Sequence, residues 1–264
     1  MATLRIEIKG RDGQIAVPTV VTALDSAVKI LMDLDAAISG QPKGSLDWMI
    51  AGLATGSAVM ELASESRLED HNYGPDVTAA FVNGLEQIEA EGATPPYISE
   101  AGMQRARRFV KLIGRGGATG LVVGGPSKTV QLTARAAVNI DQLIKVRRRS
   151  VGSVEGKIET VSIHGRPHVI VYQSGTRKAI TSKFPPERAD ALLASAKDVM
   201  GRRVNVAGVV YRNGRGEPMR VEVREIRTLG RDDELPTIEQ IGGSDPDFTG
   251  ALSTDEYIRS IRVG

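Results

Sequence analysis

Residues 203–226, RVNVAGVVYRNGRGEPMRVEVREI, contain two runs of alternating apolar and polar residues around Asn213 and Gly214. Alternation with a period of two is typical of a strand with one buried face, and Asn-Gly is a strong turn signal. We therefore predict strands over 203–211 and 219–226, joined as a hairpin. This hairpin decides the fold of the second half of the chain.

Three more strands and a helix are predicted before this hairpin. Alternating runs cover 153–163, 168–172 and 178–184, and 186–200 has helical spacing after two prolines. Gly156 and Gly208 fall where the strands of a small barrel bend sharply. The order of five strands, with one helix between the third and the fourth, resembles an OB-fold. That resemblance implies a closed five-strand β-barrel over 151–230.

The first half of the chain mixes helical and strand patterns. Apolar spacing predicts helices over 19–39, 76–90, 99–113 and 133–146, and strands over 4–9, 48–54, 58–63, 120–123 and 129–132. This order is not a regular alternation of strand and helix, so the fold class is α+β with a small sheet. We predict three parts: an α+β domain (1–146), an all-β OB-like barrel with one helix (151–230), and an acidic tail ending in a short helix (231–264).

Composition excludes several kinds of chemistry. The chain has no cysteine, which removes disulfides and thiolate sites, and only three histidines. No apolar run reaches the roughly 18–20 residues of a membrane helix, and the first residues lack a signal-peptide core. The glycine-rich stretch 114–120 follows a predicted helix, which is the wrong context for a dinucleotide loop. We expect a cytoplasmic, non-enzymatic protein with no membrane partner, catalytic residue, metal site or cofactor.

The net charge of +2 hides a strong asymmetry along the chain. Residues 1–144 hold 13 Lys and Arg against 16 Asp and Glu, residues 145–231 hold 19 against 8, and residues 232–264 hold 2 against 8. A basic OB-like barrel can bind single-stranded nucleic acid across its second and third strands and its loops. The other interpretation is that these charges are solvated or paired within the molecule. The candidate nucleic-acid-binding residues are Arg166, Tyr172, Arg177, Lys178, Lys183, Arg212 and Arg215.

The tail contains a well-defined helix start. Ser253 and Glu256 are spaced as a capping box, and Leu252 and Tyr257 flank it as a hydrophobic staple. The helix predicted over 254–263 is too short to be stable alone. It therefore docks either on its own protein or in the groove of a partner.

Residues 247–262, DFTGALSTDEYIRSIR, resemble the neutralising segments of bacterial type II antitoxins that pair with PIN-domain ribonucleases. The resemblance implies a protein toxin as partner, apolar anchors on the short helix, and an arginine that meets the metal-binding carboxylates of the nuclease. The rest of the chain departs from that family, because it has no ribbon-helix-helix or helix-turn-helix DNA-binding segment. The implied partner-binding residues are Phe248, Leu252, Tyr257, Ile258, Arg259, Ile261 and Arg262, with Arg259 or Arg262 as the arginine that enters the acidic site.

Three functions follow from these patterns. The first is an antitoxin-like protein that neutralises a PIN-type ribonuclease through its tail. The second is an OB-fold protein that binds single-stranded nucleic acid and whose acidic tail is autoinhibitory, competing for the basic barrel. The third is an enzyme with a site in the N-terminal domain.

Overall fold

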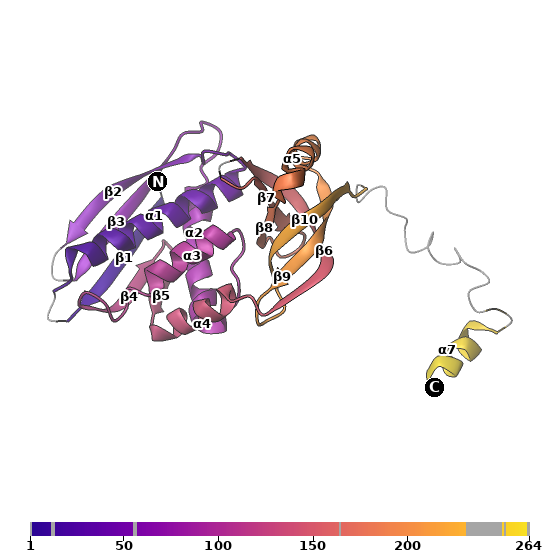
Figure 1. Ribbon diagram of the computed structural model, residues 1–264. Helices are drawn as coiled ribbons and strands as arrows, with labels where there is room; N and C mark the ends of the chain where they lie inside the picture. The colour runs from indigo at the N-terminus through magenta and orange to yellow at the C-terminus, as the bar shows by residue number, and fades with distance from the viewer. Residues whose placement is uncertain are drawn as a thin grey trace. The chain divides into compact units, whose positions relative to one another are not determined.

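The computed structural model describes residues 2–11, 14–54, 57–163, 165–230, 250 and 252–262, and only the backbone of Glu91, Ile261 and Arg262. The chain forms two compact units, Met1–Thr228 and Leu229–Gly264 (Figure 1). Two five-stranded sheets and the helices between them are described in the first unit, and a single helix is described in the second. The α+β class predicted from sequence is confirmed.

The first sheet belongs to residues 2–146, which we call the N-terminal lobe. Its strands are antiparallel in the order β2-β3-β1-β4-β5. The elements are β1 (Ala2–Gly10), α1 (Val17–Ser39), β2 (Leu46–Ala54), β3 (Ala58–Ser66), α2 (Gly74–Glu86) with a π-helical turn (Gln87–Glu91), α3 (Glu100–Val110), β4 (Ala118–Gly124), β5 (Thr129–Leu132) and α4 (Ala134–Ile144).

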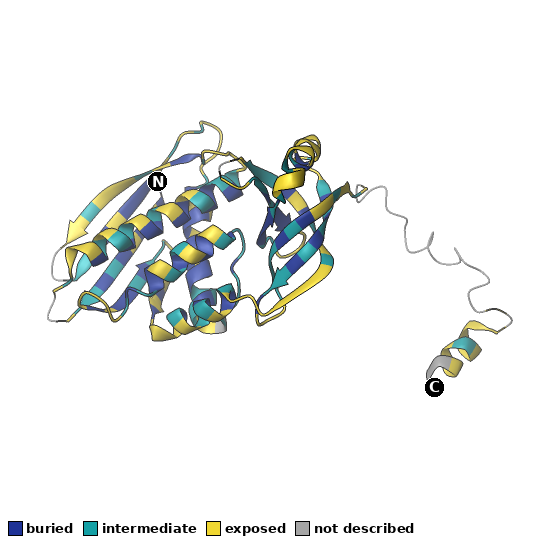
Figure 2. Cartoon of the chain, in the orientation of Figure 1, coloured by how far each residue is buried: buried dark blue, intermediate teal, exposed yellow. Residues whose placement is uncertain are grey.

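Alternation along β1 builds the core of this lobe. Leu4, Ile6 and Ile8 are fully buried, whereas the alternate residues Thr3 and Arg5 are exposed. The helices pack on the buried face of the sheet, and the other face is largely open to solvent (Figure 2). Each predicted helix and strand of this lobe is present, although the long helix predicted over 76–90 divides into α2 and the π-helical turn.

The second sheet is formed by residues 148–228, which we call the ring. The strand order β10-β8-β7-β6-β9 closes on itself, because β10 pairs both with β9 and, in parallel, with β8. This confirms the predicted succession of three strands, a helix and two strands. The elements are β6 (Arg148–Ser162), β7 (His168–Gln173), β8 (Ala179–Lys183), a 3-10 turn (Pro186–Arg188), α5 (Ala189–Asp198), β9 (Arg203–Arg212) and β10 (Pro218–Thr228).

The ring has its own aliphatic core, in which Ile158, Val206 and Phe184 are fully buried. Gly208 lies where β9 passes close to β10, so that an added Cβ would clash with the Glu222 carbonyl oxygen. Glycine is therefore required at this crossing, as the sequence pattern indicated. The first strand, β6, begins at Arg148, five residues before the predicted start, because it pairs with β9 from Arg148 opposite Arg212 onward. Its opening residues are exposed and break the alternation, so the pattern did not predict them.

Candidate functional site

The ring meets the N-terminal lobe through the hairpin between β9 and β10. Asn213, which is 2% exposed, shapes this hairpin by accepting the backbone N–H of Arg215 (2.9 Å) and of Glu217 (3.0 Å) through Oδ1. Arg215 reaches across to donate to the Gly92 carbonyl oxygen (3.1 Å), and Thr94 donates its hydroxyl to Glu217 Oε2 (2.7 Å). We call the contacts between the N-terminal lobe and the ring the lobe contact, and these hairpin contacts are its first part.

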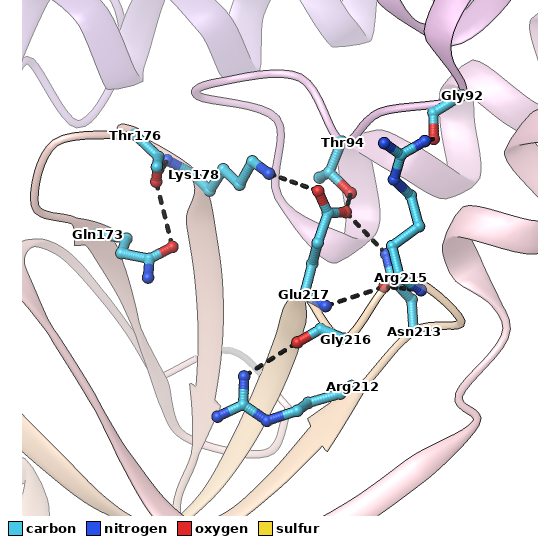
Figure 3. A network of polar contacts seen from close by, with 10 residues as sticks. All are labelled: Gly92, Thr94, Gln173, Thr176, Lys178, Arg212, Asn213, Arg215, Gly216 and Glu217. Carbon is cyan, nitrogen blue, oxygen red and sulfur yellow. Dashed lines mark hydrogen bonds and ion pairs between the residues drawn. The ribbon is translucent and has the colours of Figure 1, made fainter. Parts of the chain in front are cut away.

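Glu217 is the centre of the polar network in Figure 3. Its Oε1 accepts from Lys178 Nζ (2.6 Å), and its Oε2 accepts from Thr94 and from Asn213 Nδ2 (2.9 Å). Burial acts to raise the pKa of Glu217, but the hydrogen bonds from Lys178, Asn213 and Thr94 outweigh it and hold that pKa below its ordinary value. The carboxylate is therefore a fixed structural anion at neutral pH.

A second part of the lobe contact is built around Arg177. Its guanidinium carbon lies 5.3 Å from the centre of the Tyr97 ring and 5.6 Å from that of Tyr172, and its Nη2 is 3.4 Å from Glu159 Oε1. Arg177 (φ 54°) and Tyr97 (φ 60°) both adopt left-handed backbone, and the Tyr97 N–H donates to the Arg177 carbonyl oxygen (2.9 Å). Burial of Tyr172 raises the pKa of its hydroxyl well above its ordinary value. The cation thus lies against both rings at the boundary of the lobe and the ring, with its side chain 41% exposed.

The third part of the lobe contact is Glu100, the first residue of α3. Its two carboxylate oxygens face Lys183 of β8 (3.3 Å) and Arg220 of β10 (3.5 Å). The Arg220 guanidinium carbon also lies 4.3 Å from the centre of the Tyr211 ring. An acidic residue of the N-terminal lobe therefore neutralises two cations of the ring.

The candidate nucleic-acid-binding residues fall into two groups, those at the lobe contact and those away from it. Five lie in it or beside it: Tyr172, Arg177, Lys178, Lys183 and Arg215. Arg166 donates from Nε to the Phe184 carbonyl oxygen (2.9 Å), and Arg212 donates from Nη1 to the Gly216 carbonyl oxygen (3.1 Å). Tyr172 is 3% exposed and Phe184 fully buried, so a nucleic-acid base reaches neither ring in this conformation.

Another basic surface remains exposed beside the hairpin. Arg147, Arg148 and Arg149 are all exposed, and Arg148 lies opposite Arg212 in the register of β6 and β9. A cavity of about 200 Å³ opens next to them. Its lining is Gly92, Asn139, Gln142, Leu143, Arg147, Gly214 and Arg215. Arg147 and Gln142 are exposed and supply donors that suit an anion such as a phosphate, whereas Asn139 donates from Nδ2 to the carbonyl oxygens of Ile88 and Glu89.

The C-terminal helix α7 (Thr254–Arg262) carries the expected capping box. The Ser253 N–H donates to Glu256 Oε2 (2.9 Å), the Glu256 N–H donates to Ser253 Oγ (3.4 Å), and the bonds from Ser253 lower the pKa of Glu256. Leu252 is 45% and Ile258 37% exposed, Tyr257 is half-buried and Arg259 is exposed. Ile261 and Arg262 lie in α7 with undescribed side chains, and Phe248 lies outside the described residues.

The sequence did not predict the partners that the basic residues meet in the lobe contact, namely Thr94, Tyr97, Glu100 and Glu217. Thr94 and Glu217 are 123 residues apart, and nothing local indicates that they meet. Tyr97 follows two prolines and Glu100 starts a helix, which are unremarkable positions. A useful signal was the difference in net charge, which is negative over residues 1–144 and positive over residues 145–231. Parts of opposite net charge tend to pair across a contact.

In the described ranges, no group of three or more His, Cys, Asp and Glu is placed to hold a metal ion, and no helix is long and apolar enough to cross a bilayer. No protein-family model, no curated protein and no solved structure matches this chain.

Proposed function

We propose that this protein is a non-enzymatic binding protein that uses its C-terminal helix to capture and neutralise a PIN-type ribonuclease, in the manner of an antitoxin. The observation that carries the proposal is the exposed apolar side of a well-capped helix: Leu252 and Ile258 are 45% and 37% exposed beside the hydrogen-bonded Ser253 and Glu256. A helix of nine residues is too short to be stable without packing. A partner groove supplies that packing.

The chemistry of the helix suits an acidic nuclease site. Tyr257 and Ile258 supply apolar contact area, while Arg259 is exposed and offers a guanidinium fork. Nucleases of this class hold divalent metal ions with carboxylates, and an arginine pairs with such carboxylates through two parallel hydrogen bonds. Arg259 or Arg262 would thus take the place of the metal's positive charge and stop catalysis.

The ring supports this assignment in a different way. We propose that it is an OB-like barrel, which the strand order and the helix between β8 and β9 support. OB-folds bind single strands on the second and third strands and on adjacent loops. At the corresponding places, Tyr172, Lys178 and Glu217 are engaged in or beside the lobe contact. This favours the tail over that face as the binding element.

Affinity isolation of the full chain from its host tests the proposal. The full chain should recover a ribonuclease in stoichiometric amount, and the chain without residues 244–264 should not. Replacement of Ile258 by Asp should abolish recovery, whereas Val138→Asp, at another exposed apolar position on α4, should not change it. Recovery of the same protein by the deleted chain would refute the proposal, provided both chains unfold at the same temperature.

The cavity beside the hairpin favours a second candidate function, the binding of single-stranded nucleic acid by the basic surface Arg147–Arg149. Such binding should weaken as salt rises, because phosphate contacts release counterions. Charge reversal at either Arg148 or Arg149 should weaken it more than the matched change Lys197→Glu on α5. If the acidic tail competes for this surface, removal of residues 231–264 should strengthen binding. Absence of binding at low salt would exclude this candidate.

A further inference from the structure

The N-terminal sheet has one protected edge and one open edge. The edge strand β5 has four residues and is preceded by Lys128. The other edge strand, β2, has nine residues, LDWMIAGLA, with Asp47 as its one charge and no proline or lysine. Edge strands expose unpaired N–H and C=O groups, and proteins usually guard them with shortness, lysine or proline. Strand β2 lacks these guards and is protected only by a bulge at Ala51.

Large apolar side chains are exposed along this open edge. Ile50 is 53% and Leu53 69% exposed, although their partners in β3, Leu62 and Met60, are buried. Ile50 and Leu53 therefore point to the side of the sheet that the helices cover, but no helix covers them. Met49, on the other face of β2, is 42% exposed.

The neighbouring flank of α1 is also apolar and exposed. Val17, Val21 and Met32 are 73%, 59% and 54% exposed, and Leu24 and Val28 are half-buried. Val17, Val21, Leu24 and Val28 follow each other at steps of four, three and four, which is the spacing of a helix seam that packs on another helix.

Two contacts show which way this flank of α1 faces. Asp35, two turns after Val28 and thus on the same side of the helix, accepts from Ser45 Oγ (2.7 Å) and from the Leu46 N–H (2.8 Å) at the start of β2. Asp33, on the other side, pairs with Arg105 of α3. The seam therefore borders β2, and the exposed residues of α1 and β2 form one surface. We call it the apolar edge: Val17, Val21, Met32, Ile50 and Leu53.

We propose that a second copy of this chain docks on the apolar edge, with the two β2 strands antiparallel and the two α1 helices side by side. A two-fold axis through the sheet extends it across both copies and closes both open edges. A single extended peptide would pair with β2 but would leave Val17, Val21 and Met32 uncovered. A second copy brings a helix as well as a strand, so both halves of the edge are buried together. The near absence of charge on β2 fits a partner that is equally uncharged.

The bulge at Ala51 limits strand pairing to one part of β2, so the helix seam has to supply much of the contact. We therefore expect a modest interface and a reversible dimer rather than a permanent one. This inference does not depend on the tail, so the chain without residues 244–264 should dimerise as the full chain does.

Sedimentation velocity of the full chain over a wide concentration range tests this proposal. The wild-type chain should show a reversible monomer–dimer equilibrium. Leu53→Lys and Val21→Lys, both at exposed positions, should each raise the dimer dissociation constant at least about tenfold, with unchanged unfolding curves. Val138→Lys, 57% exposed on α4, is the matched control and should leave the equilibrium unchanged.

Three results would overturn the proposal. The wild-type chain could stay monomeric at the highest concentration, the dimer could survive both substitutions, or all three variants could weaken it equally. If a monomeric wild-type chain lost a co-purifying partner through Leu53→Lys, the edge would belong to that partner and the self-association model would fail.

Discussion

Removing the charge of Glu217 should loosen the lobe contact while leaving its shape intact. In the wild-type chain this carboxylate accepts hydrogen bonds from Lys178, Thr94 and Asn213. The side chains of Lys178 and Glu217 are 20% and 17% exposed, so water screens the pair less than it screens a surface ion pair. Hydrogen bonds to charged groups contribute about 1.5–3 kcal/mol each. Because Gln keeps one acceptor oxygen but leaves Lys178 without an anion, we expect Glu217→Gln to cost about 1–2 kcal/mol at neutral pH.

The cost should depend on pH in a defined direction. The pKa of Glu217 is lowered in the folded chain from its ordinary value of 4.5. A carboxyl group of this kind stabilises the fold above its unfolded pKa, and the stabilisation is lost as pH falls through the folded pKa. The difference in unfolding free energy between wild type and Glu217→Gln should therefore be full at neutral pH and should shrink as pH falls below 4.5 and through the lowered pKa of the folded chain. Urea titrations followed by circular dichroism measure it.

Glu225→Gln is the matched control, because Glu225 lies on the same strand and pairs with Arg227 at an exposed position. That change should not measurably alter stability. If both variants unfold like the wild type at neutral pH, the network around Glu217 does not hold the lobes together. If the Glu217→Gln difference persists at low pH, the cause is packing rather than charge.

Three further outcomes follow from the same structure. Gly208→Ala should destabilise the chain by about 1–3 kcal/mol in urea titration, because the new Cβ meets the Glu222 carbonyl oxygen; unchanged stability would mean that the strands can separate freely there. Arg177→Gln should cost about 1 kcal/mol through loss of the cation over Tyr97, and unfolding that matches wild type would show that the stack is inert. Ser253→Ala should weaken partner recovery about fivefold without changing the melting temperature, since the lost cap acts only on the tail helix.

The sequence predicted those parts of the fold that local pattern determines. Alternation along 203–226 gave both strands of the hairpin, and apolar spacing gave α1 to within two residues of its start. The capping box at Ser253 and Glu256 was also readable, because its two bonds join residues three apart. Such features need no knowledge of the rest of the chain.

The sequence could not show what distant surfaces do to each other. The basic pattern leaves open whether Lys178 and Arg177 bind nucleic acid or pair within the molecule, and in the structure they contact Glu217 and Glu159 in and around the lobe contact. A run of basic residues has the same pattern whether its partner is a phosphate or a carboxylate on the same chain. The position of the N-terminal lobe against the ring, seen in the contacts of Thr94 and Glu100, distinguishes these cases.

The most direct test of the proposed function is RNA cleavage by the captured partner. We propose that the complex with the wild-type chain is inactive in the presence of Mg²⁺, because an arginine of α7 occupies the acidic site of the nuclease. A chain carrying Arg259→Ala and Arg262→Ala should still recover the partner through its apolar anchors, and that complex should cleave RNA. If the wild-type complex cleaves RNA as fast as the complex with the doubly substituted chain, the helix does not neutralise its partner and the antitoxin-like function is wrong.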